Sequence, residues 1–452
     1  MITPDLTIIG GGLAGTEAAW QAAQRGLRVR LFEMRPGKST GVHQTSDLAE
    51  IICSNSLGSN LPDRASGMLK NELRLLRSLL VECALHSALP AGSALAVDRE
   101  SFSKKVTEHL TMHPNIEIIR TEMAEIPTGP VIIASGPLTS DLLSHAIADL
   151  TGKNQLFFFD AIAPIVTAES INKKIAFRAS RYGEGQNIGG DYMNCPLTKE
   201  EYDSFVQVLA SADRIALRTF ETEIEQGVNA GGDHFFEGCL PVEIIARRGR
   251  QALAFGPMRP TGLADPRTGR WPYAIIQLRQ DNLAGSLYNL VGFQTNLTFS
   301  EQTRIFRMIP GLEKADFVRY GQMHRNTFLA APIILFPSLQ FRGRADLFFA
   351  GQITGIEGYM GNIASGLLAG INAAHLFRGE EPVVFPETTM LGALCNYISH
   401  ADMKDFQPMK ANFGLLPPLS STLRMDKRTR ARLFVERAKK DMEAFLVDHK
   451  VI

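Results

Sequence analysis

Residues 5–25 read DLTIIGGGLAGTEAAWQAAQR, and this stretch decides the fold. Asp5–Ile9 is a short run of strand-forming residues, a glycine-rich turn follows, and Thr16–Arg25 favours a helix. In such a unit the first glycine permits a tight turn, the second lets the backbone approach a pyrophosphate, and the third lets helix and strand pack closely. We therefore predict dinucleotide binding by the residues of the turn, which are Gly10, Gly11, Gly12, Leu13, Ala14 and Gly15.

An acidic residue follows the next strand-like run. Leu27–Phe32 ends at Glu33, near the spacing of about 20 residues at which a carboxylate accepts hydrogen bonds from ribose hydroxyls. A lone glycine motif can also be a surface turn, but here strand, turn, helix, strand and acid occur in order. The order favours a dinucleotide with an unphosphorylated ribose, and it does not separate FAD from NAD.

A second glycine-bearing stretch lies late in the chain. Asp346–Gln352 reads as a buried strand that leads to Gly351 and Gln352, and a helix-like, glycine-punctuated stretch follows. This resembles the late FAD motif of glutathione-reductase-like flavoproteins, in which a strand and a helix N-terminus hold the flavin end, with Gln352 in place of their usual acid. The alternative is one more strand–helix unit of a Rossmann sheet. Val131–Pro137, an apolar strand with a small-residue turn, resembles the central element of the same superfamily.

The two ends of the chain thus belong to one cofactor fold, and 452 residues exceed an ordinary single core. The predicted class is α/β: a glutathione-reductase-like Rossmann FAD-binding domain with an inserted smaller α/β domain. We expect the FAD-binding domain in two parts, 1–155 and 329–452, the latter with C-terminal helices. We expect residues 156–328 to form the insertion, on the substrate side.

Composition excludes several classes of protein. Lys plus Arg equals Asp plus Glu at 47 each, so a nucleic-acid partner would need a local basic patch. Arg424–Lys440 and the cluster Arg247–Arg250 are candidates, although each can equally be a solvated surface. No run is long and apolar enough to cross a bilayer, which leads us to expect a soluble, cytoplasmic protein. Five scattered cysteines favour neither a zinc site nor a disulfide framework, so no metal is expected.

Several segments resemble one enzyme family along nearly the whole chain. The chain is similar to the folate- and FAD-dependent tRNA uracil-5-methyltransferases, the TrmFO family. The segments that carry the resemblance are Glu33–Pro36, Ile52–Leu57, Phe236–Glu243, Gly292–Asn296 and Arg319–Thr327. The related GidA or MnmG flavoproteins, which modify the wobble uridine of tRNA, have a helical C-terminal extension for which 452 residues leave no room.

The resemblance implies methylation of the T-loop uridine, uridine-54, to 5-methyluridine. Methylenetetrahydrofolate would supply the carbon, reduced FAD the hydride, and NAD(P)H would regenerate reduced FAD. C5 of uridine is a poor nucleophile until a thiolate adds to C6. The resemblance places Cys239 as the nucleophile and Cys53 as an acid/base or flavin partner, while Cys83, Cys195 and Cys395 are expected to be structural. Tyr320, His324 and Arg325 are candidates for RNA contacts, and the oligomeric state stays open.

Two alternatives remain. A GidA-like enzyme would act on the wobble uridine instead of the T loop. A small-molecule flavin oxidoreductase would leave Cys53 and Cys239 without a role and would not bind tRNA.

Overall fold

The computed structural model describes residues 4–40, 42–152, 156–183, 185, 187, 189–215, 240–404, 406–419 and 425–449, with backbone alone for 156–161 and 323–325. Cys239, the first half of Phe236–Glu243 and Arg424 therefore lie outside the described residues. Among the helices that are described, none is both long and apolar enough to cross a bilayer.

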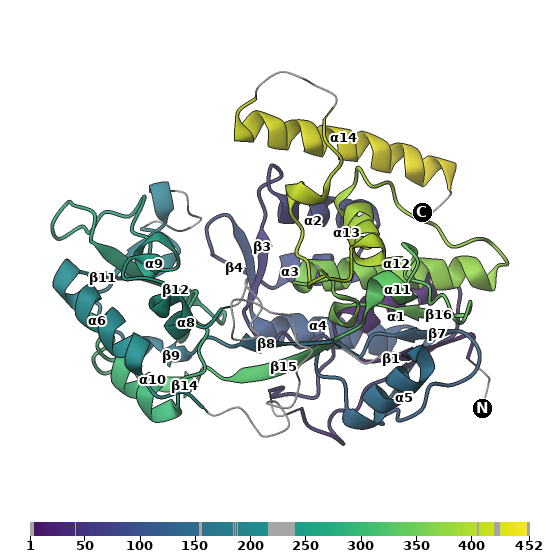
Figure 1. The fold of residues 1–452 in the computed structure, drawn as a ribbon, viewed down its shortest axis with the longest axis horizontal. Coiled ribbons are helices and arrows are strands. Elements are labelled where there is room, and N and C mark those ends of the chain that lie inside the picture. The colour runs from purple at the N-terminus through teal and green to yellow at the C-terminus, as the bar shows by residue number, and fades with distance from the viewer. Residues whose placement is uncertain are drawn as a thin grey trace.

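The first sheet joins the two ends of the chain. Five parallel strands stand in the order β16-β7-β1-β2-β6. Their bounds are β1 Leu6–Ile9, β2 Val29–Phe32, β6 Ile116–Ile119, β7 Val131–Ile133 and β16 Leu347–Phe349. In Figure 1, α12 (Tyr359–Phe377) lies above these strands and α5 (Asp141–Thr151) below them. Buried Val, Ile, Leu and Phe dominate the strands, as expected for a parallel sheet covered on both faces.

Helix α1 (Leu13–Gln24) packs on α12 through small residues. A Cβ added at Gly366 would lie 2.1 Å from the carbonyl oxygen of Ala14, and one at Gly370 would lie 2.5 Å from that of Ala18. The glycines of α12 therefore let the two backbones touch, and this contact ties the late segment to the N-terminal turn.

Smaller elements surround this sheet. A three-stranded sheet has the order β3-β5-β4, with β3 Ser56–Ser59, β4 Ala88–Leu89 and β5 Ala94–Val97. The further helices are α2 Ala65–Leu75, α3 Leu79–His86, α4 Arg99–Met112, α11 Ala331–Ile334, α13 Met390–His400 and α14 Lys427–Asp448. Short 3-10 turns are Ala168–Ser170, Arg181–Gly183, Gln352–Thr354 and Phe413–Leu415.

The middle of the chain forms a second, antiparallel sheet with the order β10-β11-β12-β13-β9-β14. Its strands are β9 Ile165–Thr167, β10 Phe177–Ala179, β11 Tyr192–Leu197, β12 Ala274–Gln280, β13 Leu287–Leu290 and β14 Phe317–Arg319. Its helices are α6 Lys199–Ser211, α8 Val242–Arg247, α9 Ala252–Phe255 and α10 Phe299–Phe306. Helix α6 begins with a capping box in which Thr198 and Glu201 bond each other's backbone N–H groups.

An antiparallel ribbon carries the chain out to this second sheet and back. It consists of β8 (Leu156–Ala161) and β15 (Met323–Phe328), and it runs between the two lobes in Figure 1. Each lobe has its own large hydrophobic core. The α/β class predicted from the sequence is confirmed. The domain boundaries at 155/156 and 328/329 stay a prediction, which the ribbon and the two cores support.

Candidate active site

The glycine turn sits at the carboxyl end of β1. Gly10 has a φ of +109°, and a Cβ there would lie 2.5 Å from the carbonyl oxygen of Ala134, so a side chain cannot be accommodated. At Gly15 an added Cβ would lie 1.8 Å from the Gly10 oxygen, and the residue thus serves helix–strand packing. Gly12 has open space where a Cβ would be. Backbone N–H groups at the start of α1 therefore face a site that a ligand can approach closely.

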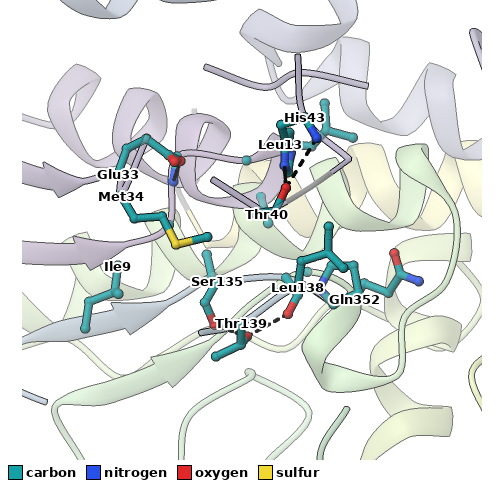
Figure 2. A pocket seen from close by; sticks show the side chains of 18 of the residues that line it. Ile9, Leu13, Glu33, Met34, Thr40, His43, Ser135, Leu138, Thr139 and Gln352 are labelled. Atoms are coloured by element: carbon teal, nitrogen blue, oxygen red, sulfur yellow. Dashed lines mark hydrogen bonds between the residues drawn. The ribbon is translucent and has the colours of Figure 1, made fainter. Parts of the chain in front are cut away.

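The turn borders a first cavity, which encloses about 1090 Å³ of space between protein atoms including its open mouth. Figure 2 shows Glu33 and Met34 on one side of it and Ser135, Thr139 and Gln352 on the other. Of the residues predicted to bind the cofactor, those that line this cavity are Gly10, Gly11, Gly12, Leu13, Ala14, Glu33, Gly351 and Gln352.

Glu33 is held in place by three hydrogen bonds. Its Oε2 accepts from the N–H of Gly11 at 3.0 Å, and its Oε1 accepts from Arg35 N and Nε, each at 2.9 Å. Arg35 also donates to Glu50 Oε2 at 2.9 Å, so one buried guanidinium bridges two carboxylates. Burial alone would raise the pKa of Glu33, but the bonds and charge of Arg35 outweigh it and lower the pKa. Glu33 is thus ionised, and Oε2 retains acceptor capacity toward the cavity.

The late segment reaches the same cavity from the other side. Gly351 follows β16 with a φ of +84°, and its N–H donates to Ser365 Oγ at 2.8 Å. Gln352 comes next and lines both this cavity and a second one. The two glycine-bearing ends of the chain, expected from sequence to act together, therefore meet at one cavity.

Cys53 lies on a loop that residues from three distant parts of the chain hold in place. Tyr359 Oη, at the start of α12, accepts from the N–H of Cys53 at 2.9 Å and from that of Ser54 at 3.1 Å. Arg279 of β12 donates to Ser54 Oγ and to Asn55 Oδ1, each at 2.7 Å. Arg99 of α4 donates to the Ile51 carbonyl at 2.6 Å. The loop is thus fixed jointly by both lobes.

Tyr359 keeps its proton. Burial, followed by the nearby Cys53, raises the pKa of its phenol. Because its oxygen already accepts two N–H bonds, the O–H group remains available as a donor toward the cavities that the ring lines.

Half-buried Cys53 lies where the two cavities meet, since Cys53, Gln352 and Tyr359 line both. The second cavity encloses about 1320 Å³ including its mouth, and it presents the polar side chains of Arg279, Gln294 and Lys410. A group in the first cavity and a molecule in the second can therefore both reach the Cys53 thiol.

Cys239, the other predicted catalytic thiol, lies outside the described residues. The chain resumes beside the second cavity: Val242 N–H donates to the Gln294 carbonyl at 2.7 Å. Glu243 accepts from Asn296 N–H at 2.7 Å and from Thr295 Oγ1 at 2.8 Å. Arg247 of α8 donates to the Ala210 carbonyl of α6 at 2.9 Å.

The three cysteines expected to be structural are buried. Burial raises the pKa of Cys83 and of Cys395 to about 12 each, and that of Cys195 even further. Of the thiols that the structure describes, Cys53 alone lines the first and second cavities.

Tyr320, a sequence candidate for base stacking, already stacks on Phe299 and Phe317 with ring centroids 5.0 and 5.4 Å apart. Its hydroxyl also bonds Thr303 at 3.0 Å. The side chains of His324 and Arg325 are not described. Sequence reasoning missed Tyr359, Arg279 and Arg99, because only tertiary folding brings them to Cys53.

These features define a class: an α/β protein with a dinucleotide-type glycine turn and a thiol between the cavity beside that turn and a second cavity. A family model described as glucose inhibited division protein A matches residues 5–381. The methylenetetrahydrofolate--tRNA-(uracil-5-)-methyltransferase TrmFO of Halalkalibacterium halodurans is 51% identical over 446 residues, covering 99% of both chains. That of Symbiobacterium thermophilum is 54% identical over 450 residues, covering 99% of this chain and 98% of that protein.

Among solved structures, GidA of Aquifex aeolicus superposes with a TM-score of 0.69 at 15% identity, covering 97% of this chain and 73% of that one, which shows a shared fold. The chain belongs to the TrmFO family, which is related to glucose inhibited division protein A.

Proposed function

We propose that this chain methylates C5 of a uridine in tRNA with methylenetetrahydrofolate as the one-carbon donor, the reaction that the names of its relatives state. More specifically, we propose that the target is uridine-54 of the T loop. Reduced FAD supplies the hydride, and NAD(P)H regenerates the reduced FAD. The observation that carries the proposal is the position of Cys53 between the two cavities.

The first cavity fits FAD. Gly12 leaves the backbone open to a pyrophosphate, and the ionised Glu33 can accept from a ribose hydroxyl. Asn326 lines the same cavity, is buried, and has neither amide atom hydrogen-bonded within the described residues. Asn362 also lines this cavity, and its buried Oδ1 has no hydrogen-bond partner within the described residues. Buried polar atoms without partners are costly, so a polar ligand that bonds them would account for both side chains.

Bound FAD would supply the redox chemistry, and the protein would place and polarise the reactants. Glu33 and the start of α1 hold the ribose and the phosphates. Gln352 and Tyr359, which line both cavities, would border the reacting end of the bound group and limit access of water to it. Tyr359 also fixes the backbone from which the Cys53 thiol projects.

In the proposed reaction the Cys239 thiolate adds to C6 of the uracil, which makes C5 nucleophilic toward the one-carbon unit. Once the new carbon–carbon bond has formed, a base removes the C5 proton as the one-carbon carrier leaves, which gives an exocyclic methylene on the uracil. Addition of a hydride to that carbon then completes the methyl group and expels the Cys239 thiolate from C6. Cys53, at the edge of the second cavity, is our candidate for this proton transfer. Because a T-loop uridine is packed inside folded tRNA, its base must swing out to enter the cavity.

Purified protein with FAD, NADPH, unmodified tRNA and labelled methylenetetrahydrofolate tests the proposal, with nucleosides analysed afterwards. Label in 5-methyluridine at the T loop supports it. Label in a wobble nucleoside favours a GidA-like reaction, and label confined to the folate pool with rapid NADPH turnover favours a small-molecule oxidoreductase. Cys53→Ala and Cys239→Ala should abolish product, whereas Cys83→Ala, which removes a buried helical thiol remote from both cavities, should retain it.

A further inference from the structure

Helix α14 presents a strongly basic outer surface. Its inner face is buried through Ala431, Phe434, Ala438, Met442 and Phe445. Phe445 packs on Phe385 with ring centroids 4.7 Å apart, which fixes the orientation of the helix. We define the α14 patch as the exposed side chains of Lys427, Arg430, Arg432 and Lys440. Within the described residues these four make no ion pair and no side-chain hydrogen bond.

The order of charges along α14 opposes its own dipole. A helix is stabilised by acids near its N-terminus and by bases near its C-terminus. The first turn of α14 has no acidic residue, its last turn has no basic one, and its acids Glu436, Asp441, Glu443 and Asp448 begin near the middle and continue to the C-terminal end. The capping residue Asp426 offsets this in part by accepting from Arg428 and Thr429 N–H. The bases in the first turns of α14 therefore gain nothing from the helix dipole, and a bound polyanion would offset the repulsion among them.

The basic end of α14 lies beside the second cavity. Arg428 Nε is 3.6 Å from Asp63 Oδ2, and Asp63 stands just before α2. Ser66, in the first turn of α2, lines the second cavity together with Cys53. In Figure 1 the N-terminal end of α14 extends over β3, toward the second lobe. A polyanion on the N-terminal part of the patch would thus lie near α2, whose Ser66 lines the second cavity.

We propose that the α14 patch binds backbone phosphates of the tRNA whose uridine enters the second cavity; this inference rests on the proposed function. RNA is favoured over an anionic membrane because the apolar face of α14 is already packed against the protein and cannot insert into lipid. Cations that follow a phosphate backbone supply affinity without reading sequence.

The test compares two triple variants of the FAD-loaded full chain with the wild type. The patch variant carries Arg430→Gln, Arg432→Gln and Lys440→Gln. The control carries Lys104→Gln, Lys199→Gln and Lys314→Gln, which removes the same charge from exposed positions on α4, α6 and the segment before β14. Flavin absorbance and thermal denaturation verify folding. The dissociation constant of unmodified tRNA is then measured between 50 and 200 mM salt, with vesicles rich in anionic lipid as a parallel ligand.

The patch variant should bind tRNA about tenfold more weakly at low salt, and its slope of log affinity against log salt should be smaller by about 2, since each phosphate contact contributes roughly 0.7–0.9. The control should bind like the wild type, and KM for tRNA should rise in parallel with the dissociation constant. Equal tRNA binding by both variants overturns the inference, as does a defect restricted to vesicles. A wild type that binds but does not methylate tRNA contradicts the proposed function instead.

Discussion

The hydroxyl oxygen of Tyr359 accepts the backbone N–H of Cys53 at 2.9 Å, across more than 300 residues of sequence. It also accepts the N–H of Ser54. The first residue of α12, which lines both cavities, thereby sets the conformation of the loop that carries the thiol. Because Arg279 holds the same loop from the second sheet, the geometry at Cys53 depends on both lobes.

Tyr359→Phe should lower methylation at least tenfold while leaving the protein folded. The change leaves two N–H groups without an acceptor, at about 1–3 kcal/mol each if they stay dry. The loop should relax and displace the thiol. Initial rates and thermal denaturation measure both effects. Tyr397→Phe, which removes a hydroxyl that bonds the Gln407 carbonyl at the surface, is the matched control. Wild-type rates in the Tyr359 variant would refute the role of this bond.

Asn326→Ala should weaken FAD binding about tenfold, as expected for the loss of one or two hydrogen bonds to a ligand. Stability of the flavin-free protein should change little, because the amide has no partner within the described residues. Titration of apo-protein with FAD measures the affinity. Asn289→Ala provides the comparison, since Asn289 is also buried but lines the second cavity alone. Equal affinities for all three proteins would argue against a flavin contact at Asn326.

Gly366→Ala should separate α1 from α12, because the new Cβ would lie 2.1 Å from the Ala14 oxygen. Overpacking of this kind costs about 1–3 kcal/mol, and more where backbone must move. The displaced start of α1 should also lose flavin. Gly37→Ala, at an exposed turn where the nearest atom is 3.4 Å away, should be neutral. Chemical denaturation and flavin content measure the two effects. A Gly366→Ala protein with the stability and flavin content of the wild type would show that α1 and α12 are not in close contact.

Stability should fall as pH rises from about 5 to 8, in part because of Glu72. Burial raises the pKa of this carboxyl to about 7, although it accepts from Met390 and Leu391 N–H at 2.7 and 2.9 Å. The folded form binds a proton more tightly than the unfolded chain, whose pKa is about 4.3. The stabilisation is therefore complete below about pH 4 and is lost as pH rises through 7.

In Glu72→Gln the decline of the free energy of unfolding between pH 5 and 8 should be smaller by about 1–3 kcal/mol. Urea denaturation at several pH values measures it. Glu117→Gln, on an exposed side chain, should decline like the wild type. Parallel curves of unfolding free energy against pH for all three proteins would show that the pKa of Glu72 is the same in the folded and the unfolded chain.

Local sequence patterns were sufficient to predict those parts of the site that are formed by short continuous segments of the chain. The turn Gly10–Gly15, the acid Glu33 and the late segment at Gly351 each carry a glycine or charge pattern tied to backbone geometry, and the structure brings them to one cavity. Glu33 has an additional partner, Arg35, that the motif does not specify.

The surroundings of Cys53 were not predictable in this way. Tyr359 is an aromatic residue at the start of a helix, and Arg279 is a cation on a strand. Neither position in the sequence indicates a hydrogen-bond partner more than 200 residues away. Their roles arise from the packing of two lobes. The role of Cys239 stays a prediction, because it lies outside the described residues.

The most direct test of the account is the alkylation rate of Cys53, followed by mass spectrometry of the folded protein. If the thiol lies where the two cavities meet, it should react while Cys83, Cys195 and Cys395 remain unmodified. FAD alone should slow its reaction, and methylenetetrahydrofolate or tRNA added to the FAD-loaded protein should slow it further. A Cys53 alkylation rate that neither FAD nor the second ligand changes would contradict the central claim.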